Sequence, residues 1–234
     1  MIAKEGYTIV AIAVVLALVL VVIGVTMPPL GRVLTVAGAA LMLGFILYFF
    51  RDPQRSAPAG AGSLLLAPAD GKVVVVKEVE EPLYLKGPAR QISIFLSPLD
   101  VHVNRIPADG VIEFDQYVSG DYLVAWHPKA SEKNERSQLG LRHPSGLKVL
   151  FKQIAGLAAR RVVYHVTVGD TVKAGQRFGI VKFGSRMDVL VPPTVEVEVE
   201  VGDRVRAGET ILGRLPEKVP VETASEAISQ DLSS

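Results

Sequence analysis

The sequence has no cysteine, a single tryptophan and no excess of one charge sign. Without cysteine, disulfides, cysteine zinc sites and thiol nucleophiles are excluded, so covalent chemistry must use Ser, Thr, Lys, His or a carboxylate. The 25 Lys and Arg residues nearly balance the 24 Asp and Glu residues, which argues against a nucleic-acid partner. No His, Asp and Glu residues have the spacing of metal ligands, so no metal is expected.

Charge is also scarce in residues 1–50, which contain only Lys4, Glu5 and Arg32. Two uncharged runs, 8–27 and 33–50, are each long enough to cross a bilayer as a helix. The prolines and glycine of 28–32 predict a turn that neither helix continues through. We therefore expect an antiparallel transmembrane hairpin with both ends on the same side of the membrane.

The positive residues around the hairpin predict its orientation. Lys4 precedes the first run and Arg51 and Arg55 follow the second, whereas the turn carries only Arg32. The positive-inside bias places both ends in the cytoplasm, at the plasma membrane. The first run is too long for the apolar core of a signal peptide, and a second run follows it. The expected organisation is a hairpin over 1–55, one domain over 56–216 and a disordered polar tail over 217–234.

The domain after the hairpin is predicted to be mainly β. Its short apolar or β-branched runs are separated by turn residues, as in strands. The alternation of valine and glutamate over Val195–Val201 predicts one half-buried strand. The other expected strands are Leu64–Leu66, Val73–Val76, Gln91–Leu96, Lys148–Ile154, Arg161–Val168 and Ile180–Phe183.

Two sequence repeats indicate paired turns within this domain. The segment 168–175, V-G-D-T-V-K-A-G, returns as V-G-D-R-V-R-A-G at 201–208, and P-A-D-G occurs at both 68–71 and 107–110. Gly-Asp and Asp-Gly pairs favour tight turns that need a positive φ. Quasi-repeated hairpins of this kind resemble the flattened β-sandwich of lipoyl and biotinyl carrier domains, a barrel-sandwich-like fold. We infer no function from the repeats.

Several short blocks follow one another in a distinctive order after the hairpin. They are Phe49-Phe50-Arg51-Asp52-Pro53, Pro68-Ala69-Asp70-Gly71, Ser97-Pro98-Leu99-Asp100-Val101-His102-Val103-Asn104-Arg105, Asn134-Glu135-Arg136, Gln153-Ile154-Ala155-Gly156, Gly175-Gln176-Arg177-Phe178-Gly179 and Phe183-Gly184-Ser185. No single block is specific, but the ordered set resembles the short, membrane-associated class of phosphatidylserine decarboxylases. The resemblance runs from about Phe49 to Pro216, and the preceding hairpin fits it.

The resemblance implies an enzyme that makes its own cofactor. The family cuts itself at a Gly-Ser bond, which here is Gly184–Ser185, giving a β chain of 1–184 and an α chain of 185–234 that remain together as a heterodimer. Ser185 would become a covalent pyruvoyl group, which supports decarboxylation of phosphatidylserine in the membrane to phosphatidylethanolamine and CO₂. Glycine suits the cleavage site because it has no Cβ and tolerates strained backbone.

The same resemblance assigns roles to two further residues. His102 would be the general base for self-cleavage, the proton donor after decarboxylation, or both. Asp70 would orient His102, as a carboxylate fixes an imidazole tautomer. The alternative for Asp70 is an ordinary Asp-Gly turn, because Asp109 has the same local sequence.

A second group of polar residues is expected to shape the substrate site. Asn134, Glu135 and Arg136 could line the headgroup pocket, or could form a solvated charged turn. Arg160 and Arg161 could bind lipid phosphate, since the planar guanidinium matches phosphate oxygens, or could be surface residues.

Two functions without catalysis compete with this interpretation. The first is a membrane-anchored adaptor built on a lipoyl-like sandwich, although the sustained heptads of such adaptors are absent from the sequence. The second is a carrier domain modified on a lysine such as Lys129. Both alternatives predict an intact chain, whereas the decarboxylase predicts two fragments.

Overall fold

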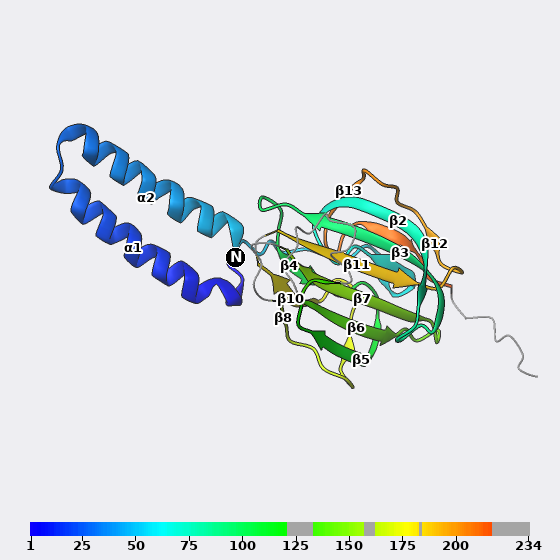
Figure 1. Cartoon of the computed structure of the whole chain (residues 1–234). Helices are drawn as coiled ribbons and strands as arrows, with labels where there is room; N and C mark the ends of the chain where they lie inside the picture. The colour runs from blue at the N-terminus through cyan, green and yellow to red at the C-terminus, as the bar shows by residue number, and fades with distance from the viewer. Residues whose placement is uncertain (121–132, 157–161, 183, 217–234) are drawn as a thin grey trace, which may run out of the picture.

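A helical hairpin and a β domain make up the molecule, as the sequence predicts (Figure 1). This computed structural model describes residues 1–120, 133–156, 162–182 and 184–216. The expected tail at 217–234 and the candidate carrier residue Lys129 lie outside those ranges. The hairpin projects from one end of the β domain, and the N-terminus lies where the two parts meet (Figure 1).

The hairpin consists of α1 (Tyr7–Val25) and α2 (Pro29–Phe49), which pack against each other. The turn is shorter than the predicted 28–32, because Pro29 begins α2 instead of interrupting it. Proline is well tolerated at this first helical position, where its missing N–H would have no partner. Arg32 then reaches back across the turn, and its Nη2 donates to the carbonyl oxygen of Val25 at 3.1 Å.

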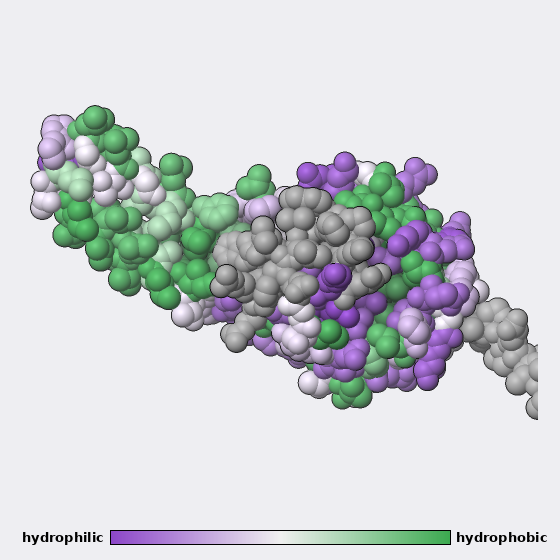
Figure 2. Space-filling model, in the orientation of Figure 1, coloured by the Kyte–Doolittle hydropathy of each residue, from purple (hydrophilic) through white to green (hydrophobic). Residues whose placement is uncertain are grey.

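Small residues form the contact between the two helices. Ala13, Ala17 and Ala39 are buried there, and a Cβ on Gly24 would lie 3.4 Å from Thr35. The large apolar side chains face outward instead, which gives the hairpin its almost continuous hydrophobic surface (Figure 2). By length and composition, each helix could cross a membrane.

The β domain contains one curled sheet of eight strands and two smaller sheets, with antiparallel pairing throughout. The large sheet has the order β13 (Arg204–Val205), β2 (Gly71–Glu81), β3 (Gly87–Leu96), β11 (Ser185–Val191), β7 (Lys148–Ala155), β6 (Arg136–Arg142), β5 (Gly110–Val118) and β9 (Thr171–Val172). The small sheets are β1 (Leu64–Leu66), β14 (Ile211–Arg214) and β12 (Glu196–Val197), and β4 (Val103–Arg105), β10 (Arg177–Val181) and β8 (Val162–Tyr164). In Figure 1 the sheet containing β4, β10 and β8 lies at the end of the domain that joins the hairpin.

A buried apolar cluster fills the space between the sheets. One face of β3, β7 and β11 contributes Ile92, Ile94, Phe151, Met187 and Val189 to it, all fully buried. This alternation of inward and outward side chains is what fixes the register of the central strands.

The sequence repeats form two equivalent contacts, called clasps below, in which the aspartate of each P-A-D-G segment binds a V-G-D-x-V-x-A-G turn. Asp70 Oδ1 accepts a hydrogen bond from the backbone N–H of Ala207, and Asp109 Oδ1 accepts one from Ala174, each at 2.8 Å. The glycines of the two V-G-D-x-V-x-A-G turns have positive φ, as predicted, with 79° at Gly175 and 73° at the equivalent Gly208. Of the two Asp-Gly glycines, Gly71 has a positive φ and Gly110 does not. These two glycines meet, since a Cβ on Gly208 would lie 3.2 Å from the Gly175 Cα.

The structure corrects some of the predicted strands. The Val195–Val201 segment is not one strand, because only Glu196–Val197 pairs with β14, although Val195 and Val199 are buried and the intervening glutamates are exposed. The chain leaves the ladder there to enter the Gly202 turn, whose φ is 114°. The predicted strand over Arg161–Val168 is shorter within the described range, where β8 ends at Tyr164. The strands that were not predicted are β4, β5, β6, β9, β11, β13 and β14.

Candidate active site

Ser185 begins the central strand of the large sheet. Its Cα lies opposite Leu96 of β3 and Ala155 of β7, so backbone pairing holds it on both sides. The side chain is fully buried, and among the residues that the structure describes its Oγ has no hydrogen-bond partner. Gly184 precedes it with a φ of 65°, in the left-handed region that favours glycine. A buried hydroxyl without a partner is costly, so this arrangement indicates a functional role.

The chain contains a second Gly-Ser pair, Gly62–Ser63, which differs in each of these respects. Ser63 is exposed, and its hydroxyl donates to the Gly60 carbonyl oxygen at 3.2 Å. Gly62 does not have a positive φ. The dipeptide alone therefore does not mark the site, whereas the buried environment of Ser185 does.

His102 lies beside Gly184, just before β4. Its Nε2 is 3.4 Å from the Gly184 nitrogen, and its Nδ1 is 2.9 Å from the carbonyl oxygen of Asp100. Since a carbonyl only accepts, Nδ1 carries the proton and Nε2 presents its lone pair to the Gly184 N–H. The contact is long, so the lone pair is weakly engaged.

Burial lowers the pKa of His102 to about 4, although the hydrogen bond to Asp100 and the Asp100 charge oppose this shift. The imidazole is consequently neutral at pH 7. A neutral imidazole can accept a proton, so this environment favours the role of general base. The proton-donor role requires the charged form, which the same environment disfavours.

Asp70 does not make the expected hydrogen bond to His102. Its carboxylate binds Arg55 through two contacts of 2.7 Å and also accepts the Ala207 N–H. Asp70 acts on His102 only through its charge, which contributes least to the pKa of His102. The Asp100 carbonyl fixes the tautomer in its place.

Hydrogen bonds link three buried polar side chains near the site, Ser137, Gln153 and Asn104. None of the three has a role predicted from the sequence. Ser137 Oγ donates to Gln153 Oε1 at 2.9 Å, and Gln153 Nε2 donates to Asn104 Oδ1 at 2.8 Å. The Val163 carbonyl, 3.5 Å from Gln153 Nε2, supports this orientation because it too needs a donor. Asn104 Nδ2 is then left buried, with no partner among the described residues. The Asn104 side chain is two residues beyond His102 on an extended segment, so the two project to the same side.

Residues 134–136 contact the end of β7, the strand that pairs with Ser185. Asn134 Nδ2 donates to the Ala155 carbonyl at 2.7 Å, and Ala155 is the β7 partner of Ser185. Glu135 Oε1 accepts the Val162 N–H at 3.2 Å. Both side chains are buried, so they are not a solvated turn. Arg160 and Arg161 lie outside the described residues.

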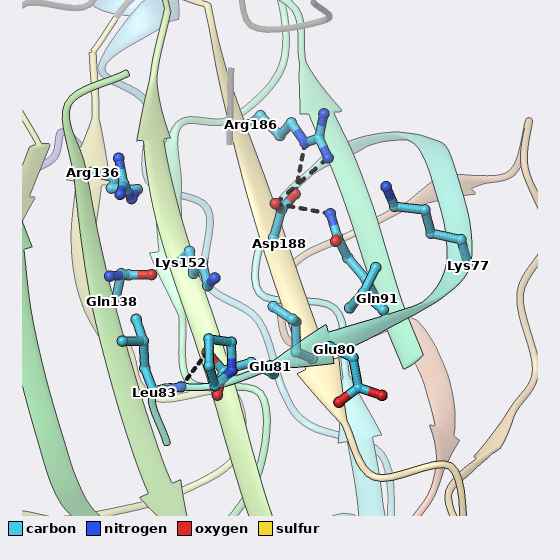
Figure 3. Close-up of a pocket in the computed structure, with 13 residues that line it drawn as sticks. Lys77, Glu80, Glu81, Leu83, Gln91, Arg136, Gln138, Lys152, Arg186 and Asp188 are labelled. Carbon is cyan, nitrogen blue, oxygen red and sulfur yellow. Dashed lines mark hydrogen bonds and ion pairs between the residues drawn. The ribbon is translucent and has the colours of Figure 1, made fainter. Parts of the chain in front are cut away.

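A polar pocket of about 310 Å³ opens on the outer face of the same sheet (Figure 3). Arg186, the residue after Ser185, lines it and pairs with Asp188 at 2.6 Å. Lys152 extends from the neighbouring strand, and burial lowers its pKa. Glu81 binds the backbone N–H groups of its own loop, including Leu83 at 3.2 Å. The pocket therefore shares strand β11 with Ser185 but lies on the opposite face from the core.

In the described ranges, no three His, Asp or Glu side chains are grouped closely enough to hold a metal ion.

Comparison with known proteins identifies the family. A family model described as phosphatidylserine decarboxylase matches residues 42–213. A phosphatidylserine decarboxylase proenzyme of Salinibacter ruber is 66% identical over 187 residues, which cover 80% of this chain and 82% of the relative. Another, of Symbiobacterium thermophilum, is 47% identical over 216 residues, covering 92% of this chain and 96% of the relative. The chain therefore belongs to the phosphatidylserine decarboxylase family and is an enzyme.

Proposed function

We propose that the chain cuts itself at Gly184–Ser185, converts Ser185 to a pyruvoyl group and then decarboxylates phosphatidylserine to phosphatidylethanolamine and CO₂. The observation that carries this proposal is the buried Ser185 hydroxyl without a partner, next to a left-handed glycine whose N–H faces a neutral imidazole. Family membership favours this enzyme over the adaptor and carrier alternatives.

Self-cleavage requires the Ser185 hydroxyl to lose its proton as Oγ attacks the Gly184 carbonyl carbon. His102 Nε2 accepts that proton, because burial keeps the ring neutral and its lone pair faces the Gly184 peptide nitrogen. The C–N bond then breaks, the serine nitrogen takes up a proton and an ester remains. Loss of the Ser185 Cα proton expels the Gly184 carboxylate and leaves dehydroalanine at 185. Addition of water and loss of ammonia give the pyruvoyl group.

The surroundings of Ser185 fit such a group. Within the described part of the chain, a Cβ on Gly184 would meet no atom within 4 Å, so these residues leave the bond that must rearrange uncrowded. Once present, the pyruvoyl ketone supplies an electron sink for decarboxylation. The chain itself holds the group in place, since β11 is paired on both edges. Asn134 and Glu135 contribute by fixing the end of β7 and the start of β8 beside it.

The hairpin suits a lipid substrate. Two helices able to span a bilayer would hold the site at the surface where lipid headgroups lie, with the β domain on the cytoplasmic face of the plasma membrane. The proposed division is a hairpin over 1–55 and a catalytic domain over 56–216. After cleavage, fragments 1–184 and 185–234 form the heterodimer.

Intact-mass spectrometry of the purified chain tests the proposal. We expect two fragments, 1–184 and 185–234, with the second blocked at its N-terminus and reactive toward a hydrazide probe. Vesicles containing phosphatidylserine should release CO₂ when the cut protein is added.

Variants of the two Gly-Ser pairs make a matched comparison. Ser185→Ala should remain a single inactive chain, whereas Ser63→Ala should be cut like the wild type, since the Ser63 hydroxyl is exposed and bonded within its own turn. Cleavage of Ser185→Ala at the same bond, or an intact and carbonyl-free wild-type chain, would refute the proposal.

A further inference from the structure

The end of the second apolar helix touches the candidate base directly. Phe49 is the last residue of α2, and its ring centroid lies 4.2 Å from that of His102, with 35° between the ring planes. Phe49 and Phe50 are fully buried, and their rings meet edge to face at 5.0 Å. They belong to an apolar cluster that also contains Val101 and Val103, the neighbours of His102 in the chain.

Arg51, two residues after Phe49, holds the loop that carries His102. Arg51 Nη2 donates to the Leu99 carbonyl at 2.8 Å, while Nη1 donates to the Tyr48 carbonyl at 2.7 Å. Leu99 lies in the turn closed by the Asp100 N–H and the Ser97 carbonyl at 2.9 Å. The same turn presents the Asp100 carbonyl that binds His102 Nδ1. Arg51 therefore connects the helix end to the group that sets the imidazole tautomer.

Buried ion pairs fasten the helix end to the small sheet next to the site. Asp52 pairs with Arg105 of β4 at 3.3 Å and with Arg177 of β10 at 3.1 Å. Arg177 also pairs with Glu5, just before α1, so both ends of the hairpin are held at one place. The position of Phe49 against His102 is thus fixed by contacts on both helices.

We propose that Phe49 and Arg51 are positioning residues of the active site, which hold the His102 ring and its loop against Gly184–Ser185. The site is then complete only when the hairpin is docked on the β domain. This inference rests on the proposed function, and it adds to the hairpin a part in the chemistry besides anchoring.

The charged groups around His102 set the direction of the expected effect. Asp100 and Asp70 raise the pKa of the imidazole, Arg51 lowers it, and burial lowers it most. Replacing Phe49 by alanine would admit water to one face of the ring, so the pKa should rise from about 4 toward the ordinary 6.5. Removing Arg51 acts in the same direction, because its positive charge opposes protonation.

The experiment compares Phe49→Ala, Phe49→Leu and Arg51→Met in the full-length chain in nanodiscs. Phe45→Ala is the matched control, because Phe45 lies one turn earlier on α2, is 42% exposed and has its ring tilted at 41° to that of Phe49, with 6.3 Å between the centroids. Chains made by pulse-labelled cell-free synthesis are followed for fragment formation from pH 4 to pH 8. The His102 imidazole is titrated by NMR in the Ser185→Ala background and assigned with His102→Gln.

We expect Phe49→Ala and Arg51→Met to slow fragment formation about tenfold or more, with the midpoint of the pH profile moved upward. Phe49→Leu should recover part of the rate because it restores apolar cover, and Phe45→Ala should match the wild type. The titration should show the same upward shift in Phe49→Ala and no shift in Phe45→Ala.

Folded Phe49→Leu and Arg51→Met chains with unchanged cleavage rate, pH profile and His102 titration would overturn the inference, even if Phe49→Ala fails to fold. The titration does not require cleavage. A wild-type chain that stays intact would therefore refute the proposed function, whereas an unchanged titration in the variants would refute the positioning role.

Discussion

Two buried side-chain atoms lack a hydrogen-bond partner among the residues described, Ser185 Oγ and Asn104 Nδ2. Ser185 is the residue whose hydroxyl reacts in the proposed self-cleavage, and Asn104 lies two positions from the candidate base. The tetrahedral species formed by attack on Gly184 places negative charge on its carbonyl oxygen. A buried amide donor with nothing to bind in the uncut chain is suited to stabilise that charge.

Replacing Asn104 by leucine should therefore slow self-cleavage by about a hundredfold, as is typical for loss of one oxyanion donor. Gln153 would also lose its acceptor, so stability should fall by about 1–3 kcal/mol. The time course of fragment formation measures the first effect, and urea unfolding in the Ser185→Ala background measures the second.

Ser137→Ala provides the control, since it breaks the far end of the same chain of hydrogen bonds and leaves the Asn104 amide in place. Equal slowing in both variants would mean that the amides matter only for packing.

The buried imidazole predicts a specific dependence of stability on pH. The pKa of His102 is lowered to about 4 from 6.5, so between these values the unfolded chain binds a proton that the folded chain excludes. Stability from this group is fully present above pH 6.5 and is lost as the pH falls toward 4, by up to about 3 kcal/mol. Urea unfolding of Ser185→Ala at pH 7 and pH 4.5 should show this loss, and adding His102→Gln should reduce it. If both proteins lose the same stability, the histidine is not buried as described.

At this scale the sequence suggests candidate catalytic residues but not the partners of their side chains. Order along the chain is enough to pick out Ser185 and His102. It does not reveal which carbonyl or carboxylate meets the imidazole, because Asp70 and Asp100 both lie in turns and only the folded loop decides between them. Gln153, which is 49 residues away in sequence, binds Asn104 Oδ1 and so sets the orientation in which Asn104 Nδ2 lacks a partner among the described residues.

At the scale of elements, the two clasps share the hydrogen bond from a backbone N–H to the aspartate but differ in how exposed the paired cation is. Asp70 pairs with Arg55, and the exposed fractions of the two side chains are 14% and 8%. Asp109 pairs with Lys173, which is 75% exposed. The P-A-D-G repeat was recognisable from sequence, whereas Arg55 as the partner of Asp70 was not, since it comes from the segment that follows the hairpin.

Matched Asp→Asn variants should separate these roles. Asp70→Asn leaves the Arg55 cation buried without its carboxylate and should cost about 3–5 kcal/mol. Asp109→Asn breaks a solvent-exposed pair and should cost at most about 1 kcal/mol. Chemical denaturation of both variants in the Ser185→Ala background gives the comparison. If Asp70→Asn keeps full stability yet fails to cut in the Ser185 chain, Asp70 acts on His102 and not on the fold.

Two of the strands that the sequence missed, β5 and β6, have a common cause. Within β5, Asp115 and Gln116 interrupt the apolar pattern, and β6 begins with Arg136 and carries Gln138 on its outer face. Their polar side chains face outward at the sheet surface, so hydrophobic alternation is weak. Val195–Val201 shows the opposite error, because perfect alternation predicts burial correctly but cannot ensure a partner strand.

At the scale of the whole molecule, the proposed cut lies at the start of a strand that the rest of the sheet encloses. Strand β11 belongs to fragment 185–234, whereas its neighbours β3 and β7 belong to fragment 1–184. Strands β13 and β14 also pair across the two fragments, with β2 and β1. The interface is thus part of the original core.

We expect the two fragments to co-elute in size-exclusion chromatography in detergent and to separate only in concentrated guanidinium chloride. Recovery after removal of the denaturant should depend on protein concentration, because refolding becomes bimolecular. Free elution of fragment 185–234 under native conditions would contradict the sheet order described here.

The contact of Phe49 with His102 has a kinetic consequence. A reactive centre that touches the last residue of an apolar helix encounters substrate by lateral diffusion in two dimensions. The quantity that governs turnover is then the mole fraction of phosphatidylserine among the surrounding lipids. Mixing inert phosphatidylcholine into the same proteoliposomes should lower the rate, whereas diluting those proteoliposomes in buffer should leave turnover per enzyme unchanged.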